Sequence, residues 1–280
     1  MKTENFSSTI PSQTTFRNPR ILRSHEDRFR CPYTIPAAHE ITIRDLLRHT
    51  SGLTYQWNSD LGPMYKDANV ASGLLPYDGT IGDSVKRLAT VPLLFNPGER
   101  WGYSLSVDVL GRLIEVISGM PLDEFFRTRI FEPLGMKDTF FFPPDNKVDR
   151  LTTAYTYYPD KGLNRFPDTP ITEDSFSYSA DYPVRSPKKL FSGGAGLTSS
   201  VPDYARFCQM ILNGGKLGNV RVLSPKSIEL MTQNQSGAGP WTWLPYRWHQ
   251  VTSRGIGNAR PIRLGADSSI PNFPLIPKKT

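Results

Sequence analysis

Ser186 is the one serine in the sequence that stands three residues before a lysine, Lys189. On a helix, residues with this spacing share a face, and the amine can help to activate the hydroxyl for attack on a carbonyl carbon. Pro187 follows the serine at once, and Gly193 and Gly194 come soon after the lysine, which leaves little room for a helix. The pattern is more typical of a turn or cap, and Ser186 and Lys189 are kept as catalytic candidates beside that interpretation.

Asp45, His49 and Ser51 have the residue types of a catalytic triad. A triad needs the serine and histidine side chains to face each other, with the carboxylate on the far imidazole nitrogen, and residues so close in sequence rarely meet that condition. No Gly-x-Ser-x-Gly elbow occurs, and no Cys or His pair has the spacing of metal ligands. Gly194 and Gly196 are not followed by the third glycine of a dinucleotide-binding loop. The sequence therefore predicts no metal and no cofactor.

Six segments with helical spacing of apolar residues would position such groups. Their expected first residues or caps are Thr42, Thr80, Ser104 or Ser106, Pro121, Ser200 and Ser224. The first helix is expected to bury Ile43, Leu46 and Leu47. The third is the clearest, and it ends at Gly119. Its apolar stripe consists of Val109, Leu110, Leu113, Ile114 and Ile117.

Composition divides the chain into three parts. Residues 1–15 are rich in Ser and Thr without periodicity, which predicts an irregular segment. Residues 16–236 contain the helices and, at 138–192, a long polar stretch that indicates loops with short strands. Residues 237–280 form an aperiodic basic tail, and translation out of frame is one interpretation of it.

The charge distribution argues against several partners. The formal net charge is +7, but basic residues concentrate at the two ends and leave the middle close to neutral. This distribution is not typical of a nucleic-acid-binding surface, so no nucleic acid is expected as partner. No long apolar run predicts a membrane span. The N-terminal residues lack the apolar stretch of a secretory signal, so a cytoplasmic location is the default, with Cys31 and Cys208 as free thiols.

Four segments together resemble the β-lactamase-related serine hydrolases, which include class C β-lactamases, penicillin-binding proteins and family VIII carboxylesterases. They are 41–53 (ITIRDLLRHTSGL), 95–104 (FNPGERWGYS) running into 108–115 (DVLGRLIE), 130–136 (IFEPLGM) and 192–197 (SGGAGL). Their order and spacing are those of the family, and the resemblance covers about residues 16–235. The form Tyr-Ser-x-x-x-Asp-Val-Leu-Gly is most similar to the esterase branch.

The resemblance implies an α+β, β-lactamase/transpeptidase-like fold, here incomplete, with mainly the helical lobe and few strands of the antiparallel sheet. It implies acyl hydrolysis of a small ester or lactam through an acylated serine, without a cofactor. The family activates that serine with a lysine in a Ser-x-x-Lys motif, and a tyrosine moves the proton. Tyr103 matches this proton shuttle, although Leu105 stands where many members have asparagine.

Two motifs of the family are missing from the sequence. No Ser-x-x-Lys precedes Tyr103, and residues 237–280 contain no Lys-Thr-Gly, His-x-Gly or Trp-Gly-Gly. The pattern is that of a member truncated at both ends, and a frameshift or gene-model error would produce it. Two hypotheses follow: a serine hydrolase of the esterase type by descent, inactive as it stands, or a non-catalytic pseudoenzyme or binding remnant.

Overall fold

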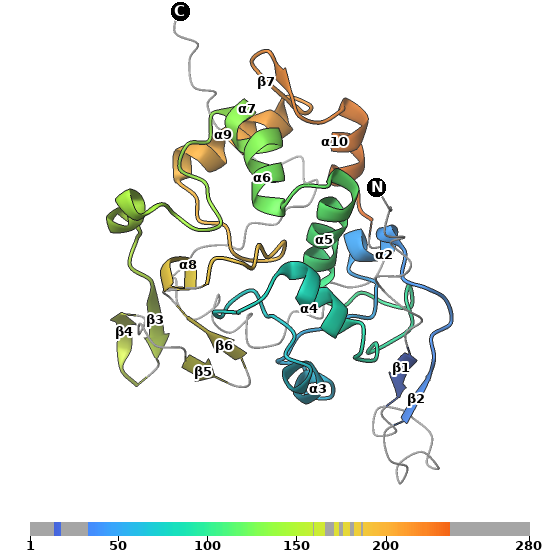
Figure 1. Cartoon of the computed structure of the whole chain (residues 1–280). Coiled ribbons are helices and arrows are strands. Elements are labelled where there is room, and N and C mark those ends of the chain that lie inside the picture. The colour runs from blue at the N-terminus through green and yellow to red at the C-terminus, as the bar shows by residue number, and fades with distance from the viewer. Residues whose placement is uncertain are drawn as a thin grey trace, which may run out of the picture. The chain divides into compact units, whose positions relative to one another are not determined.

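The computed structural model describes residues 14–17, 33–158, 160–165, 171–173, 176–179, 182–185 and 187–235 (Figure 1). All of them belong to one compact unit, Met1–Gly237. The proposed tail 237–280 and Cys31 lie outside the described residues. In the described part, no helix is long and apolar enough to cross a membrane.

Helices α2 (Ile43–Arg48) and α4 (Ile81–Leu88) begin with the same device. In each, a threonine at the N-cap accepts a hydrogen bond from the third residue of the helix, and that residue's carboxylate accepts one from the threonine amide. The pairs are Thr42 with Asp45 and Thr80 with Asp83. This capping box satisfies donors that the first helical turn would leave unpaired.

Helix α5 (Ser106–Ser118) packs against α2, α4 and α6 (Leu122–Phe126). Val109 and Leu113 of the predicted stripe are buried, whereas Ile117 is exposed. Gly119 ends α5 in the left-handed conformation, as predicted. Gly111 allows the close approach to α6, because a Cβ there would lie 2.9 Å from a methyl carbon of Leu122.

The predicted helix after Pro121 is interrupted. After α6, residues Arg127–Phe131 form a π-helical turn, and α7 (Glu132–Leu134) follows. Pro133 explains the interruption, because proline has no amide hydrogen to donate and its ring displaces the carbonyl four residues earlier. Gly135 then ends the segment in the left-handed conformation.

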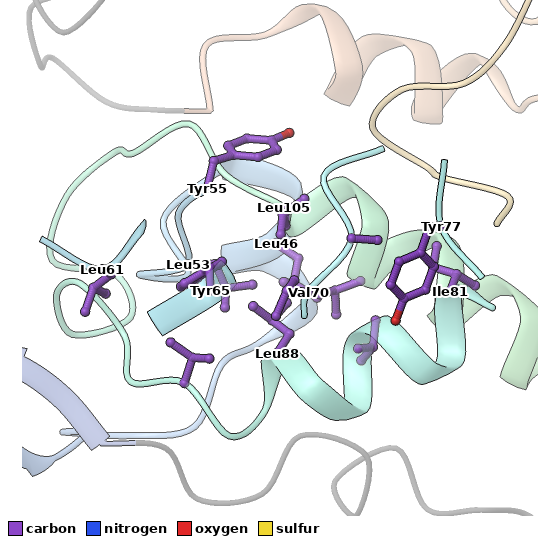
Figure 2. Close-up of a cluster of buried hydrophobic side chains, with 14 of the residues drawn as sticks. Leu46, Leu53, Tyr55, Leu61, Tyr65, Val70, Tyr77, Ile81, Leu88 and Leu105 are labelled. Carbon is purple, nitrogen blue, oxygen red and sulfur yellow. The ribbon is translucent and has the colours of Figure 1, made fainter. Parts of the chain in front are cut away.

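Two groups of buried apolar side chains stabilise these helices. The larger one lies between α2, α3 (Gly62–Asp67), α4 and the start of α5, and includes Leu46, Tyr65 and Ile81 (Figure 2). The smaller one joins the segment around Phe131 to Met210 of α9 (Val201–Leu212). Tyr55 belongs to the larger group and is drawn at its edge in Figure 2.

In the part of the chain that the structure describes, the strands form four separate antiparallel pairs. They are β1–β2 (Thr14–Arg17, Tyr33–Pro36), β3–β4 (Tyr155–Tyr158, Gly162–Arg165), β5–β6 (Ile171–Glu173, Phe176–Tyr178) and β7–β8 (Lys216–Leu217, Val220–Arg221). Two pairs and the short helix α8 (Tyr182–Arg185) fall in the polar stretch predicted to hold loops and short strands. The α+β class, dominated by helices with few strands, is confirmed.

Some apolar faces expected inside lie in solvent. Of the first helix only Leu46 is buried, while Ile43 is 47% and Leu47 67% exposed. The prediction was wrong there because α2 has six residues and presents one side to α5. Helix α10 (Pro225–Thr232) has no buried residue, and Met231 is exposed.

Candidate active site

Tyr103 lies just before α5, and its side chain is 55% exposed. Its ring centroid is 5.3 Å from that of His49 and 5.2 Å from that of Tyr55. The two neighbours come from a segment about fifty residues earlier, directly after α2. The position of Tyr103 therefore depends on how residues 49–55 pair with residues 94–105.

Backbone hydrogen bonds join these two segments along their length. The amide of Gly102 donates to the His49 carbonyl at 2.8 Å, and the amide of Leu94 donates to the Gly52 carbonyl at 2.8 Å. Gly52 has φ +81°, and a Cβ there would lie 2.2 Å from the carbonyl oxygen of Phe95. Only glycine fits this close approach, which explains the Gly in His-Thr-Ser-Gly-Leu.

Close to Tyr103 in the sequence and to its neighbour His49, buried hydroxyls form a chain of hydrogen bonds. His49 Nδ1 lies 3.2 Å from Ser104 Oγ, which lies 2.7 Å from Ser106 Oγ. Ser106 Oγ lies 2.8 Å from Ser51 Oγ. The three serines are buried, and burial lowers the pKa of His49. These hydroxyls bind one another and the histidine, so they serve as the support of the tyrosine segment.

A continuous row of aromatic rings runs through Tyr103. The His49 and Trp101 ring centroids are 6.2 Å apart with 61° between the ring planes, whereas Tyr55 and Trp57 stack at 4.0 Å with 10° between their planes. Tyr103 joins the two pairs through its contacts with His49 and Tyr55. We call these five side chains the aromatic strip.

Behind Tyr55, Asp108 of α5 holds a glycine-rich loop. Ser192 Oγ donates to Asp108 Oδ1 at 2.5 Å, and the Ala195 amide donates to Ser192 Oγ at 3.0 Å. A Cβ on Gly193 would lie 2.3 Å from the carbonyl oxygen of Val107, so the loop rests directly on the helix backbone. The SGGAGL segment thus needs its glycines for packing against α5.

The same carboxyl group changes the acid–base properties of its surroundings. Asp108 Oδ2 is fully buried, although the residue as a whole is half-buried. Burial raises the pKa of Asp108 to about 6, while the Ser192 hydroxyl and the amides of Gly193 and Gly194 act in the opposite direction. Burial also raises the pKa of Tyr55, as do the charge of Asp108 and a side-chain hydrogen bond with Tyr103. Tyr55 is therefore a neutral phenol across the physiological pH range.

The other candidates from the sequence lie elsewhere or have other partners. Ser186 is outside the described residues, and Lys189 is exposed, with its Nζ 2.7 Å from Asp78 Oδ1. The Asp45 carboxylate accepts from Thr42 and Thr50, so the structure brings His49 and Ser51 into one hydroxyl chain but turns Asp45 away from it.

Sequence reasoning missed Asp108, Tyr55 and Ser192 as members of the site. Asp108 and Ser192 stood inside quoted motifs, but no spacing rule joins residues 84 positions apart. Within the described residues, no three His, Cys, Asp or Glu side chains gather as metal ligands would.

Comparison with known proteins identifies the family of this chain. The Beta-lactamase family model matches residues 23–258. An uncharacterized protein of Mycobacterium tuberculosis is 35% identical over 71% of the chain and 45% of its own length. Esterase EstB of Burkholderia gladioli is 31% identical over 73% of the chain and 52% of its own length. The chain thus spans about half the length of the curated relatives it matches.

Solved structures give the same fold. EstCE1, described as a hydrolase with promiscuous acyltransferase activity, superposes with a TM-score of 0.63 at 26% identity, over 84% of this chain and 57% of its own. Simvastatin synthase (LovD) of Aspergillus terreus gives 0.59 at 21% identity, over 83% and 52%. With the family model matched across most of the sequence, the chain belongs to the Beta-lactamase family of β-lactamase-related serine hydrolases.

Proposed function

We propose that this protein is an esterase-type acyl hydrolase by descent, in which Tyr103 carries the proton between nucleophile and leaving group. We further propose that the 280-residue chain does not by itself form the acylated serine on which such hydrolysis depends. The substrate class would be a small ester or lactam. EstB and EstCE1, whose names describe an esterase and a hydrolase, support the ester.

One observation carries the first part: an exposed phenol is held by backbone pairing inside a family motif. Tyr103 is anchored through Gly102 and Leu105, whose amides donate to the His49 and Thr54 carbonyls. A proton shuttle must be both fixed and open to substrate, and the 55% exposure of Tyr103 meets the second condition. The hydrogen bond with the neutral phenol of Tyr55 gives the Tyr103 oxygen a fixed polar neighbour.

The second part rests on the hydroxyl and amine groups of the chain. The serines nearest to Tyr103 are buried and hydrogen-bonded to each other and to His49. Lys189, the amine of the single Ser-x-x-Lys, forms an ion pair with Asp78 on an exposed surface. A serine needs both a neighbouring base and access to the substrate to attack a carbonyl at useful rates. Ser104 has His49 beside it but is buried, and the amine of Lys189 is paired with Asp78.

A non-catalytic binding protein is the second candidate. The absent Ser-x-x-Lys upstream of Tyr103 favours it, since a folded site with an intact aromatic strip can bind an ester without cleaving it. Both candidates predict that this chain is not labelled covalently, whereas a hydrolase that is active as it stands predicts a labelled serine.

The test combines turnover with labelling. The purified chain is incubated with 4-nitrophenyl butyrate, and separately with a fluorophosphonate followed by peptide mapping. We expect no burst of nitrophenol and no labelled serine. A labelled serine, with turnover, would overturn the proposed inactivity.

Two variants then test Tyr103. If turnover is found, Tyr103→Phe should lower kcat by roughly 10²–10⁴-fold, whereas Tyr204→Phe, at an exposed tyrosine of α9, should leave it unchanged. Equal activity of both variants would exclude Tyr103 as the proton shuttle.

A further inference from the structure

We propose that the aromatic strip is the binding site for the alcohol part of the ester, and that it selects flat aromatic alcohols over saturated ones of equal size. This inference rests on the shuttle role proposed for Tyr103. It adds a ligand class and names two tryptophans, Trp57 and Trp101, as residues that determine specificity.

The first step concerns where the leaving alcohol must lie. In the proposed shuttle Tyr103 starts as the phenolate. An attacking hydroxyl, which this chain is proposed not to activate by itself, passes its proton to that phenolate as its oxygen bonds to the acyl carbon. As the acyl carbon–oxygen bond breaks, Tyr103 returns a proton to the alcohol oxygen, which keeps the electron pair. A proton donor acts only within hydrogen-bond reach. The alcohol oxygen therefore lies next to the Tyr103 hydroxyl, and its carbon skeleton begins there.

The second step concerns what surrounds that point. Tyr103 is the ring that connects the two pairs of the strip, because it contacts His49 of the His49–Trp101 pair and Tyr55 of the Tyr55–Trp57 pair. Trp57, Trp101 and His49 are half-buried, so each has a covered part and an accessible part. A carbon skeleton that starts at the Tyr103 hydroxyl begins beside Tyr55, which shares a hydrogen bond with Tyr103 and stacks on Trp57.

The third step concerns which skeleton fits. The rings of the strip already use both preferred aromatic geometries, stacked for Tyr55 with Trp57 and edge-to-face for His49 with Trp101. A flat aromatic ligand continues such a row. Each aromatic contact lowers Kd by about three- to tenfold in addition to the gain from the apolar area that it buries. The Asp108 charge behind Tyr55 disfavours anionic groups at the same place. A neutral aromatic alcohol fits both conditions.

The experiment measures binding and needs no turnover. The full chain labelled with ¹⁵N is titrated with 2-naphthalenemethanol and with its fully saturated counterpart, and the indole N–H signals of Trp57 and Trp101 are followed by NMR. We expect the aromatic alcohol to shift at least one of these signals and to bind at least threefold more tightly than the saturated one.

Variants locate the binding site. Trp57→Leu or Trp101→Leu should weaken the aromatic alcohol by roughly three- to tenfold, and the corresponding Phe variant should restore most of the affinity. Tyr204→Leu, which removes an exposed aromatic ring of α9, is the matched control and should leave binding unchanged. Circular dichroism of every variant verifies folding.

Tyr103→Phe separates this inference from the shuttle. It keeps the ring and removes the hydroxyl, so naphthalenemethanol binding should stay within about twofold even where proton transfer is lost. Equal affinity for the two alcohols, or undiminished affinity in both tryptophan-to-leucine variants, would overturn the subsite. Either result would leave the proposed role of Tyr103 untouched.

Discussion

Two regions of the molecule hold groups that acyl transfer uses, and their construction differs sharply. Around Tyr103, two chain segments pair through backbone hydrogen bonds, and buried serines of the same region bind one another. Around Lys189, an exposed amine is joined by an ion pair to Asp78, which is also exposed. The first region holds the Tyr103 ring in a defined position. In the second region, Lys189 contacts Asp78 through a long side chain that is exposed to solvent. Backbone pairing of the kind seen around Tyr103 distinguishes a structured site from a charged side chain on the surface.

The largest expected effect concerns the close approach beneath Tyr103. Gly52→Ala should lower the free energy of unfolding by about 3–4 kcal/mol, because the Cβ would lie 2.2 Å from the Phe95 carbonyl and φ is +81°. At Gly214, φ is +66° and an added Cβ would have no atom within 4 Å, so an alanine there causes backbone strain alone. Gly214→Ala should therefore lower the free energy of unfolding by about 1 kcal/mol. Urea denaturation measures both. Equal losses would contradict the view that Tyr103 rests on a tightly packed pairing.

The next effect tests whether the buried carboxyl of Asp108 is specific to this region. Its pKa is raised from 3.8 to about 6, so its contribution to stability is fully present below about pH 3.8 and is lost as pH rises through about 6. Relative to Asp108→Asn, the parent should therefore lose up to about 3 kcal/mol between pH 4 and pH 8. Urea titrations of both proteins at several pH values give this difference. A difference that does not change with pH would show that the carboxyl is well solvated.

The smallest effect is expected in the second region. Lys189→Gln should change the free energy of unfolding by less than about 0.5 kcal/mol, because an exposed ion pair contributes little in water. It should also leave fluorophosphonate labelling as it was. If the parent chain were labelled and Lys189→Gln lost that label, this amine would lie beside a reactive serine, and the contrast between the two regions would no longer hold.

Local signals predicted the helices well. Thr42, Thr80, Ser200 and Ser224 are the N-caps where the sequence placed them, and Gly119 and Gly135 end their helices. Caps and glycines act within a few residues, so a linear pattern contains the necessary information. The π-helical turn before Pro133 was not predicted. The sequence shows where the proline stands, but not how the backbone before it adapts to the missing hydrogen bond.

The candidate site was predictable only in part. Tyr103 came from resemblance to a family motif, and the structure shows its exposure and its neighbours. The roles of Asp108 and Ser192 were hidden, since their hydrogen bond joins α5 to a loop 84 residues later. Burial of a carboxyl group, and hence the direction of its pKa, depends on which segments cover it.

The sequence by itself determined the family, the caps and stops of the helices, and the glycines that its turns require. Only the tertiary structure decided which side chains meet Tyr103, which carboxyl loses its water, and which apolar residues of α2 stay in solvent. The physical reason is distance along the chain. Capping and turn preferences act over a few residues, whereas ring contacts, desolvation and close glycine packing arise between segments that only folding brings together.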